Sequence, residues 1–172
     1  MARTRLCPRT RLRGRGFTLL ELAVVMGVIA ILTLMALPSY LDRIVRKQIE
    51  ASLPLADVAK RPLNAAWALL QAFPADNAEA GLPTPDRIVG NHVSAVTVAG
   101  GAIHITFGNS VNGAIKGKVL SLRPAVVEDA PVVPPAWVCG NAKVPDKMQA
   151  KGENRTSVPN MYLPFECMGK KP

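Results

Sequence analysis

The stretch Gly16-Phe17-Thr18-Leu19-Leu20-Glu21 begins an apolar run that continues to residue 37. Within residues 17–37, Glu21 is the only charged side chain. At 1.5 Å per residue, a helix of this length is about 31 Å long, which is enough to cross the hydrocarbon core of a bilayer. A carboxylate inside such a helix costs about 2.5–3.5 kcal/mol on insertion scales, so this acid indicates a functional site. We expect Glu21 to meet a cation, because a buried charge is tolerated only when it is paired.

Six arginines and no acid precede the apolar run, in residues 1–16. Without them the chain has 15 basic and 12 acidic residues, and its formal net charge falls from +9 to +3. The positive-inside rule predicts a cytoplasmic start and an outward-facing C-terminus. A solvated tail or a nucleic-acid-binding arm is the alternative interpretation of these arginines. A secretory signal has a shorter apolar region followed by small residues, whereas here the small residue Gly16 precedes the run.

The order of Gly16, Phe-Thr-Leu-Leu-Glu, the apolar run and Pro38-Ser39-Tyr40 resembles the N-terminus of a type IV prepilin. The resemblance implies that a prepilin peptidase in the membrane removes residues 1–16, cutting between Gly16 and Phe17, and N-methylates Phe17. It implies that residues 17–38 form a transmembrane helix and later the filament core, and that residues 39–172 form the head.

In that family, the carboxylate that corresponds to Glu21 pairs with the N-terminal amine of a neighbouring subunit. The alternative is that the carboxylate is satisfied by its own helix N-terminus, where the helix dipole favours an anion. Pro38 predicts a helix kink, because proline removes a backbone hydrogen bond and crowds the preceding turn. Ala30 stands where the family commonly has a glycine, so the degree of helix melting in the filament is not predicted.

The next segment, residues 39–73, continues with helical periodicity and predicts an amphipathic helix. Pro54 and Pro62 predict a break or a second short helix. Trp67 is expected in the core rather than in a site. The predicted apolar stripe consists of Leu41, Ile44, Val45, Ile49, Leu53, Val58, Leu63, Ala66, Trp67 and Leu70.

Residues 74–92 are rich in Pro, Gly, Asp and Asn, which predicts a loop. Alternation with a period of two then predicts a hairpin of residues 93–98 and 102–107 around a glycine turn. Residues 118–123 and 137–139 are the expected third and fourth strands. The predicted fold is therefore α+β: a long N-terminal helix packed on a small sheet of three or four antiparallel strands.

Three cysteines are present, and Cys7 would be removed with the leader. Cys139 and Cys167 then form an even pair in an oxidising periplasm, which predicts a disulfide that closes a loop over residues 139–167. Two free buried thiols are the alternative. The stretches Trp137-Val138-Cys139 and Tyr162-Leu163-Pro164 also resemble elements of the disulfide-bounded loop of type IVa pilins.

The resemblance implies a structural subunit with no enzymatic activity and no cofactor. Its partners would be further copies of itself, other pilins, the prepilin peptidase and the pilus assembly platform. An inner-membrane precursor would become an extracellular pilus of a Gram-negative bacterium, supporting adhesion, twitching motility or DNA uptake. His92 and His104 have no cysteine or carboxylate at ligand spacing, so no metal site is expected. No residue in a nucleophile-elbow setting predicts catalysis.

Two other functions remain open at this point. The first is a minor pilin that binds DNA through basic residues at four-residue steps, which are Lys143, Lys147, Lys151 and Arg155. Pro145 argues against a continuous helix there, and few aromatic residues are available for base stacking, so a solvated basic loop is the simpler interpretation. The second is a pseudopilin of type II secretion, although a calcium-binding acid cluster near the C-terminus is not evident.

Overall fold

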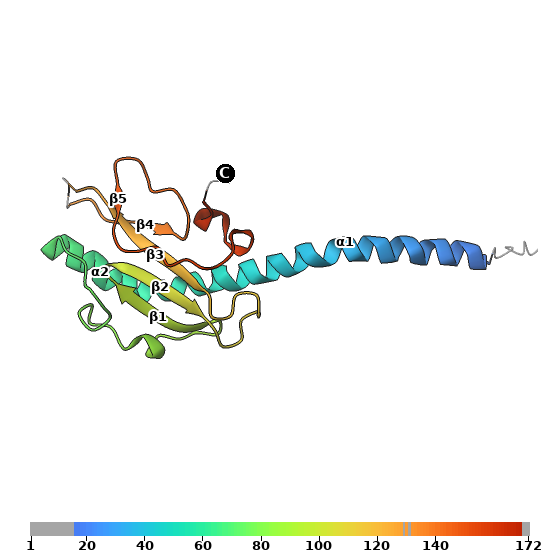
Figure 1. The fold of residues 1–172 in the computed structure, drawn as a ribbon, viewed down its shortest axis with the longest axis horizontal. Helices are drawn as coiled ribbons and strands as arrows, with labels where there is room; N and C mark the ends of the chain where they lie inside the picture. The colour runs from blue at the N-terminus through green and yellow to red at the C-terminus, as the bar shows by residue number, and fades with distance from the viewer. Residues whose placement is uncertain (1–15, 129, 131, 170–172) are drawn as a thin grey trace, which may run out of the picture. The chain divides into compact units, whose positions relative to one another are not determined.

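The computed structural model describes residues 16–128, 130 and 132–169, and the side chains of these residues apart from 36–39. Residues 1–15 of the predicted leader, with Cys7, lie outside the described residues. The chain divides into two compact units between Pro38 and Ser39. Helix α1, Leu19–Ser52, contributes residues 19–38 to the first unit and residues 39–52 to the second (Figure 1).

The helical part of the second unit breaks at Pro54, as predicted. A short 3-10 helix (η1, Leu53–Ala56) has this proline in its first turn, and α2 (Asp57–Leu70) follows it. Pro62 lies inside α2 without ending it. An interior proline costs about 3 kcal/mol or more in a helix, so the packing of α2 must offset that cost. Ala59 and Leu63, on either side of Pro62, are both fully buried.

The buried side of these helices has a regular spacing. Trp67 is 7% exposed and lies in the core, as expected. Leu41, Val58 and Leu70, which the predicted stripe included, are exposed. Val58 falls between the buried positions Ala56 and Ala59, and Leu70 is the last residue of α2. The buried positions at three- and four-residue steps are Val45, Ile49, Ser52, Ala56, Ala59, Leu63 and Trp67.

The sheet is antiparallel, with strand order β1-β2-β3-β4 (Figure 1). The predicted hairpin is confirmed, with Gly100 and Gly101 between its strands. A short fifth strand, which the sequence did not predict, pairs with β3. The strands are β1 (Val93–Ala99), β2 (Ala102–Phe107), β3 (Val119–Val126), β4 (Ala136–Cys139) and β5 (Gln149–Ala150).

Strand β3 runs through Pro124 instead of ending before it. The pairing between β2 and β3 ends at Ile103 and Leu122, two residues before Pro124. Gly140 N–H donates to the Ser121 carbonyl, so odd-numbered residues of β3 direct their backbone polar groups toward β4. The Pro124 nitrogen therefore faces the other edge, beyond the end of β2, so it interrupts no hydrogen bond to β2. On that side the Pro124 carbonyl accepts a hydrogen bond from the Lys151 N–H at 2.8 Å.

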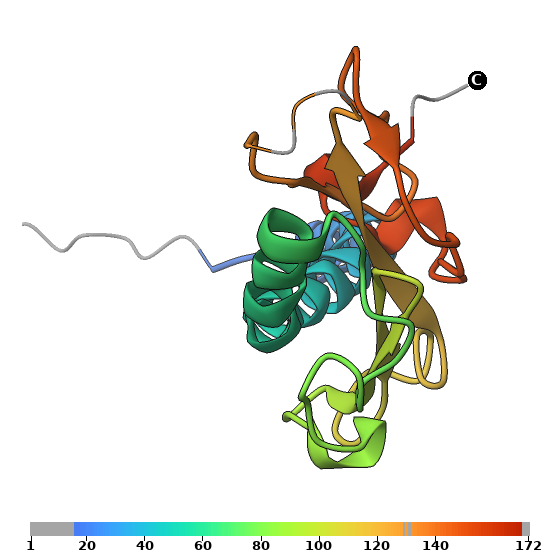
Figure 2. The same cartoon turned by 90° about the vertical axis from the view of Figure 1, so that its left-hand side faces the viewer.

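One face of the sheet packs against the helices of the second unit, as Figure 2 shows in a view along the helices. Ile103, Ile105 and Phe107 of β2 point into this core, and Leu120 and Leu122 of β3 join them. The alternate residues of β2 face the other way, yet Ala102 is 0% exposed and His104 is 3% exposed. A second layer therefore covers the back of the sheet.

That second layer is the segment of residues 151–157. The Arg155 N–H donates to Ser121 Oγ at 2.9 Å, and the Ser121 N–H donates to Thr156 Oγ1 at 3.1 Å. Gly152 lies so close to β2 that an added Cβ would be 2.6 Å from the Ala102 Cβ. The sequence had no regular pattern here and predicted only a loop. Two short 3-10 helices, η3 (Asn160–Tyr162) and η4 (Phe165–Cys167), end the described chain.

Candidate functional site

The first candidate site is the N-terminal end of α1. Thr18 precedes the helix, and its Oγ1 accepts a hydrogen bond from the Glu21 N–H at 3.2 Å. Its carbonyl accepts the first intrahelical bond, from the Leu22 N–H at 3.1 Å. Thr18 is therefore the N-cap, and Thr-x-x-Glu is the spacing of a capping box. This spacing is a local signal that the sequence itself carries.

The Glu21 carboxylate makes no ion pair or hydrogen bond within the part of the chain that the structure describes. In a complete capping box the Glu21 carboxylate would also accept the Thr18 N–H. That second bond is not formed among the described residues, so the carboxylate stays available for another partner. Phe17, one residue before the cap, is 81% exposed. This end of the chain thus brings an unpaired carboxylate and the predicted cleavage point, between Gly16 and Phe17, within five residues of each other.

The apolar residues that follow have no cover from the described chain. All side chains of residues 16–35 are exposed. By length and composition, one helix among the described residues is apolar enough to cross a membrane, and it begins at Leu19. Its backbone stays helical through Pro38. The side chain of Pro38 lies outside the described side chains, and the kink there stays a prediction.

The disulfide between Cys139 and Cys167 is confirmed, with the two Cα atoms 4.5 Å apart. It joins the end of β4 to η4, and Cys167 is fully buried in the core of the second unit. Gly140 follows with φ +55°, and its position is crowded by the Cys167 carbonyl, 2.8 Å from where a Cβ would lie. The bridge therefore closes residues 139–167 over the sheet instead of leaving an open loop.

The four basic residues considered for DNA binding are not on a helix, so their four-residue spacing does not align them on one helical face. They lie in irregular chain beside β5, and three of them are paired with acids at the surface. Lys143 contacts Asp146 at 2.9 Å, Lys151 contacts Glu128 at 2.7 Å, and Arg155 contacts Glu153 at 2.8 Å. Among the described residues Lys147 makes no ion pair, and its φ is +66°. Local pairing leaves little unbalanced charge for a phosphate backbone.

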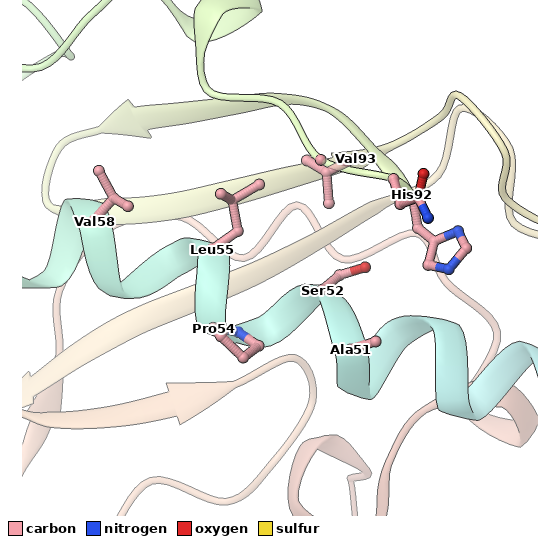
Figure 3. A pocket seen from close by; sticks show the side chains of 9 residues that line it. Ala51, Ser52, Pro54, Leu55, Val58, His92 and Val93 are labelled. Carbon is pink, nitrogen blue, oxygen red and sulfur yellow. The ribbon is translucent and has the colours of Figure 1, made fainter.

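A pocket of about 450 Å³ lies between the η1 break and the start of β1 (Figure 3). Its walls are mostly apolar, with Leu55, Val58 and Val93 among them, and His92 at one side. The Ser52 hydroxyl is already engaged, because it donates to the Gln48 carbonyl at 2.7 Å. No group of three or more metal-ligating side chains occurs among the described residues. The pocket lacks the converging polar groups that a ligand site needs.

His104 and Ser121 form a buried polar pair behind the sheet. His104 Nδ1 lies 2.9 Å from Ser121 Oγ, which also accepts the Arg155 N–H. Burial lowers the pKa of the His104 imidazole, and the charge of Arg155 adds to that effect while Glu153 opposes it. Both side chains are closed off from substrate by residues 151–157, so the pair joins two layers of the fold and is not a catalytic dyad.

Comparisons with known proteins agree with this arrangement. A family model described as pilin, a bacterial filament protein, matches residues 45–168, and a model of the prokaryotic N-terminal methylation motif matches residues 11–37. A fimbrial protein of Neisseria meningitidis serogroup B is 32% identical over 162 residues, which cover 89% of this chain and 93% of that protein.

Two further relatives add to the match. The type IV major pilin protein PilE1 of Neisseria gonorrhoeae is 33% identical over 159 residues, covering 89% of this chain and 86% of that protein. The prepilin peptidase-dependent protein D of Escherichia coli K12 is 36% identical over 103 residues, covering 59% of this chain and 68% of that protein. The chain therefore belongs to the type IV pilin family, and it is a structural subunit rather than an enzyme.

Proposed function

We propose that this pilin is made as an inner-membrane precursor and is cut by a prepilin peptidase between Gly16 and Phe17. Phe17 is then N-methylated, and the subunit enters an extracellular pilus of a Gram-negative bacterium through the assembly platform. The match of residues 11–37 to the N-terminal methylation motif supports the processing step. So does the name of the Escherichia coli relative, a prepilin peptidase-dependent protein.

The carboxylate of Glu21 is the feature that carries the proposed assembly step. It is the only charge in residues 17–37, and the Thr18 cap does not consume it. Cleavage would create an amine on Phe17 beside this carboxylate. In the filament, the Glu21 carboxylate of one subunit pairs with the Phe17 amine of its neighbour, because a buried carboxylate is tolerated only when it is paired.

Cohesion of the filament comes from the apolar helix. Burial of exposed apolar surface contributes about 25 cal/mol per Å² when that surface leaves water. In the bilayer the same side chains gain little by associating, since lipid is as apolar as a neighbouring helix. The subunit therefore waits in the membrane, and extraction by the assembly platform makes helix packing favourable.

A role as the main subunit is favoured over the alternatives. The Neisseria relatives that the chain matches over most of their length are named fimbrial proteins and type IV major pilins. The ion pairs at Lys143, Lys151 and Arg155 do not favour a DNA receptor. Nothing in the described residues favours a type II secretion pseudopilin. Fibres of this subunit would serve adhesion, twitching motility or DNA uptake.

Mass spectrometry of sheared surface fibres tests the proposal. We expect this chain as the most abundant component, beginning at N-methylated Phe17 and with Cys139 and Cys167 oxidised. Recovery of the chain beginning at Met1, or its absence from the fibres, would contradict the proposal. Retention of DNA by the purified full-length subunit at low salt would instead support the receptor role.

A further inference from the structure

Arg46 of α1 joins the helix to the far C-terminal end of the chain. Its Nη2 donates to the Met161 carbonyl at 2.8 Å, across 115 residues of sequence. Its guanidinium lies 5.0 Å from the centre of the Phe165 ring. A cation over an aromatic face at this distance is attracted to the ring. One side chain thus holds both η3 and η4 in place.

Phe165 remains 81% exposed despite this contact, and Met161 is 53% exposed. Their neighbours Leu163 and Cys167 are fully buried. The buried pair therefore anchors this segment, while Met161 and Phe165 remain exposed to solvent. Apart from its contact with Arg46, so exposed an apolar side chain contributes little to the fold of the subunit. Exposed apolar groups that are grouped in this way mark an interaction surface.

A hollow of about 340 Å³ shares Arg46 with this surface. All of the residues that line it come from one stretch of α1, so no other element of the described chain covers it. Tyr40, at one end of the hollow, is 63% exposed, and Ile44 lies one turn further along. The lining residues are Tyr40, Arg43, Ile44, Arg46, Lys47 and Glu50. We call the hollow, together with Met161 and Phe165, the base surface of the head.

A bilayer surface is a poor occupant for the base surface. Arg46 is six residues beyond Tyr40, or about 9 Å along a helix, whereas a headgroup layer is only about 5–7 Å thick. The exposed charges around Phe165 are also mixed, with Arg43 and Lys47 on α1 and Glu50 and Glu166 near them. Among the described residues, and with Arg46 counted, three cations face two carboxylates, which leaves little net positive charge to attract anionic lipid.

A second copy of this chain fits the base surface better. The chain itself carries an exposed apolar helix in residues 22–35, and the relatives are filament subunits, so apolar helices of other copies are abundant beside each head. Helices pack when side chains of one fill the hollows of another. A hollow on α1 whose Arg46 also contacts an exposed phenylalanine provides such a seat.

We propose that Phe165, held by Arg46, packs against the apolar helix of residues 22–37 of a second copy in the assembled fibre. This inference rests on the proposed function, because it requires a filament. It goes further by assigning to the disulfide-closed C-terminal segment a direct part in subunit contact. The bridge and Arg46 then serve to place Phe165 correctly.

Photo-cross-linking in intact fibres tests the contact. A benzoylphenylalanine residue is introduced in place of Phe165 in the full chain, and the same residue is introduced in place of Leu69 as a matched control. Leu69 is 82% exposed but lies near the end of α2. We expect covalent dimers from position 165 that map to residues 22–37 of the second copy, and none that map there from position 69.

Dimers that map only to head residues, or adducts only with lipid, would overturn the inference. The first result would assign Phe165 to a head-to-head contact and the second to the membrane surface. Fibres that form normally without the expected cross-link would refute this contact alone. Absence of the unmodified chain from surface fibres would instead refute the proposed function.

Substitution provides a second measurement. Phe165→Ser should lower the yield of sheared fibres about ten-fold or more, the factor expected for losing the burial of one phenylalanine side chain. Leu69→Ser should leave the yield unchanged, and both variants should be processed and folded like the wild type by circular dichroism. Equal yields for the two variants would overturn the inference.

Discussion

At the scale of single residues, Glu21 stands out because it is the only charged residue within the apolar stretch of residues 17–37. Its position in the first turn of α1 would suit an anion by itself, since the helix dipole contributes about 0.3–1 kcal/mol there. That amount does not cover the insertion cost of about 2.5–3.5 kcal/mol in a membrane helix. The carboxylate therefore needs a partner, and Thr18 has already satisfied the backbone N–H.

We predict that Glu21→Gln is processed normally but assembles poorly. Loss of the charge removes one side of a buried ion pair, which costs about 3–5 kcal/mol and lowers fibre yield about 100-fold or more. The measurement is the amount of sheared fibre together with the mass of the N-terminal peptide. Wild-type fibre yield from this variant would contradict the pairing.

His104 predicts a pH dependence of the head. Its pKa is lowered in the folded chain, first by burial and then by Arg155. Below the unfolded-state pKa of about 6.5, the unfolded chain binds more protons than the folded chain, so stability falls as pH falls. Protonation also adds a second N–H donor, and His104 Nε2 is buried with no partner among the described residues.

Melting of the full-length subunit in detergent between pH 8 and pH 5 measures this effect. We expect the wild type to lose stability as pH falls below about 6.5, and His104→Gln to lose much less over the same range. His92→Gln is the control and should behave like the wild type. An unchanged pH profile in His104→Gln would be inconsistent with the role of this imidazole.

At the scale of elements, the segment of residues 151–157 turns an ordinary two-layer head into three layers at β2. Gly152 makes that crossing possible. Its φ is +79°, a conformation that L-residues rarely adopt, and a Cβ would lie 2.8 Å from the backbone nitrogen of Ala102. The crossing also supplies two hydrogen bonds to Ser121: its hydroxyl accepts the Arg155 N–H, and its backbone N–H donates to Thr156 Oγ1.

We predict that Gly152→Ala destabilises the head by about 2 kcal/mol or more, from the strained backbone together with the clash against β2. Gly113→Ala is the matched control, because nothing lies within 4 Å of a Cβ there and its φ is not positive. That change should stay within about 1 kcal/mol. Denaturant unfolding of both full-length variants distinguishes them, and equal stabilities would argue against the crossing.

The elements differ in how far the sequence predicted them. The hairpin of β1 and β2 followed from alternation and a glycine turn, which are local signals. Strand β5 did not, because a two-residue strand has no period to detect. Asn77 was missed for a similar reason: it looked like a loop residue, yet it is 5% exposed and its amide bonds Val96 and Val98 of β1.

At the scale of the molecule, the second unit is held together by contacts between distant parts of the chain. The Cys139–Cys167 bridge links residues 28 apart, and Arg46 reaches Met161. Trp137 Nε1 of β4 also donates to Asn64 Oδ1 of α2, at 3.3 Å. The C-terminal segment thus depends on a few such ties, since little of it lies in regular structure.

Removal of the bridge should therefore weaken the head. In the chain-entropy model a bridge that closes a loop of this length contributes about 3–4 kcal/mol to the free energy of unfolding. We expect the Cys139→Ala/Cys167→Ala variant to be less stable than the wild type by that amount. Hydrogen exchange should speed up first at the backbone amides of Ser121 and Arg155. Reducing agent should destabilise the wild type and leave the variant unaffected. Wild-type stability of the variant would contradict this prediction.

The sequence by itself determined the apolar helix with its single acid, the positions of the four main strands along the chain and the pairing of the two cysteines. These features depend on composition, on local periodicity and on the two cysteines that remain when Cys7 is set aside with the predicted leader, so they need no knowledge of distant contacts. Only the tertiary structure decided that residues 151–157 bury the back of β2, that three basic residues are neutralised by nearby acids, and that Arg46 presents Phe165. Such contacts join residues far apart in the chain, and no local pattern specifies them.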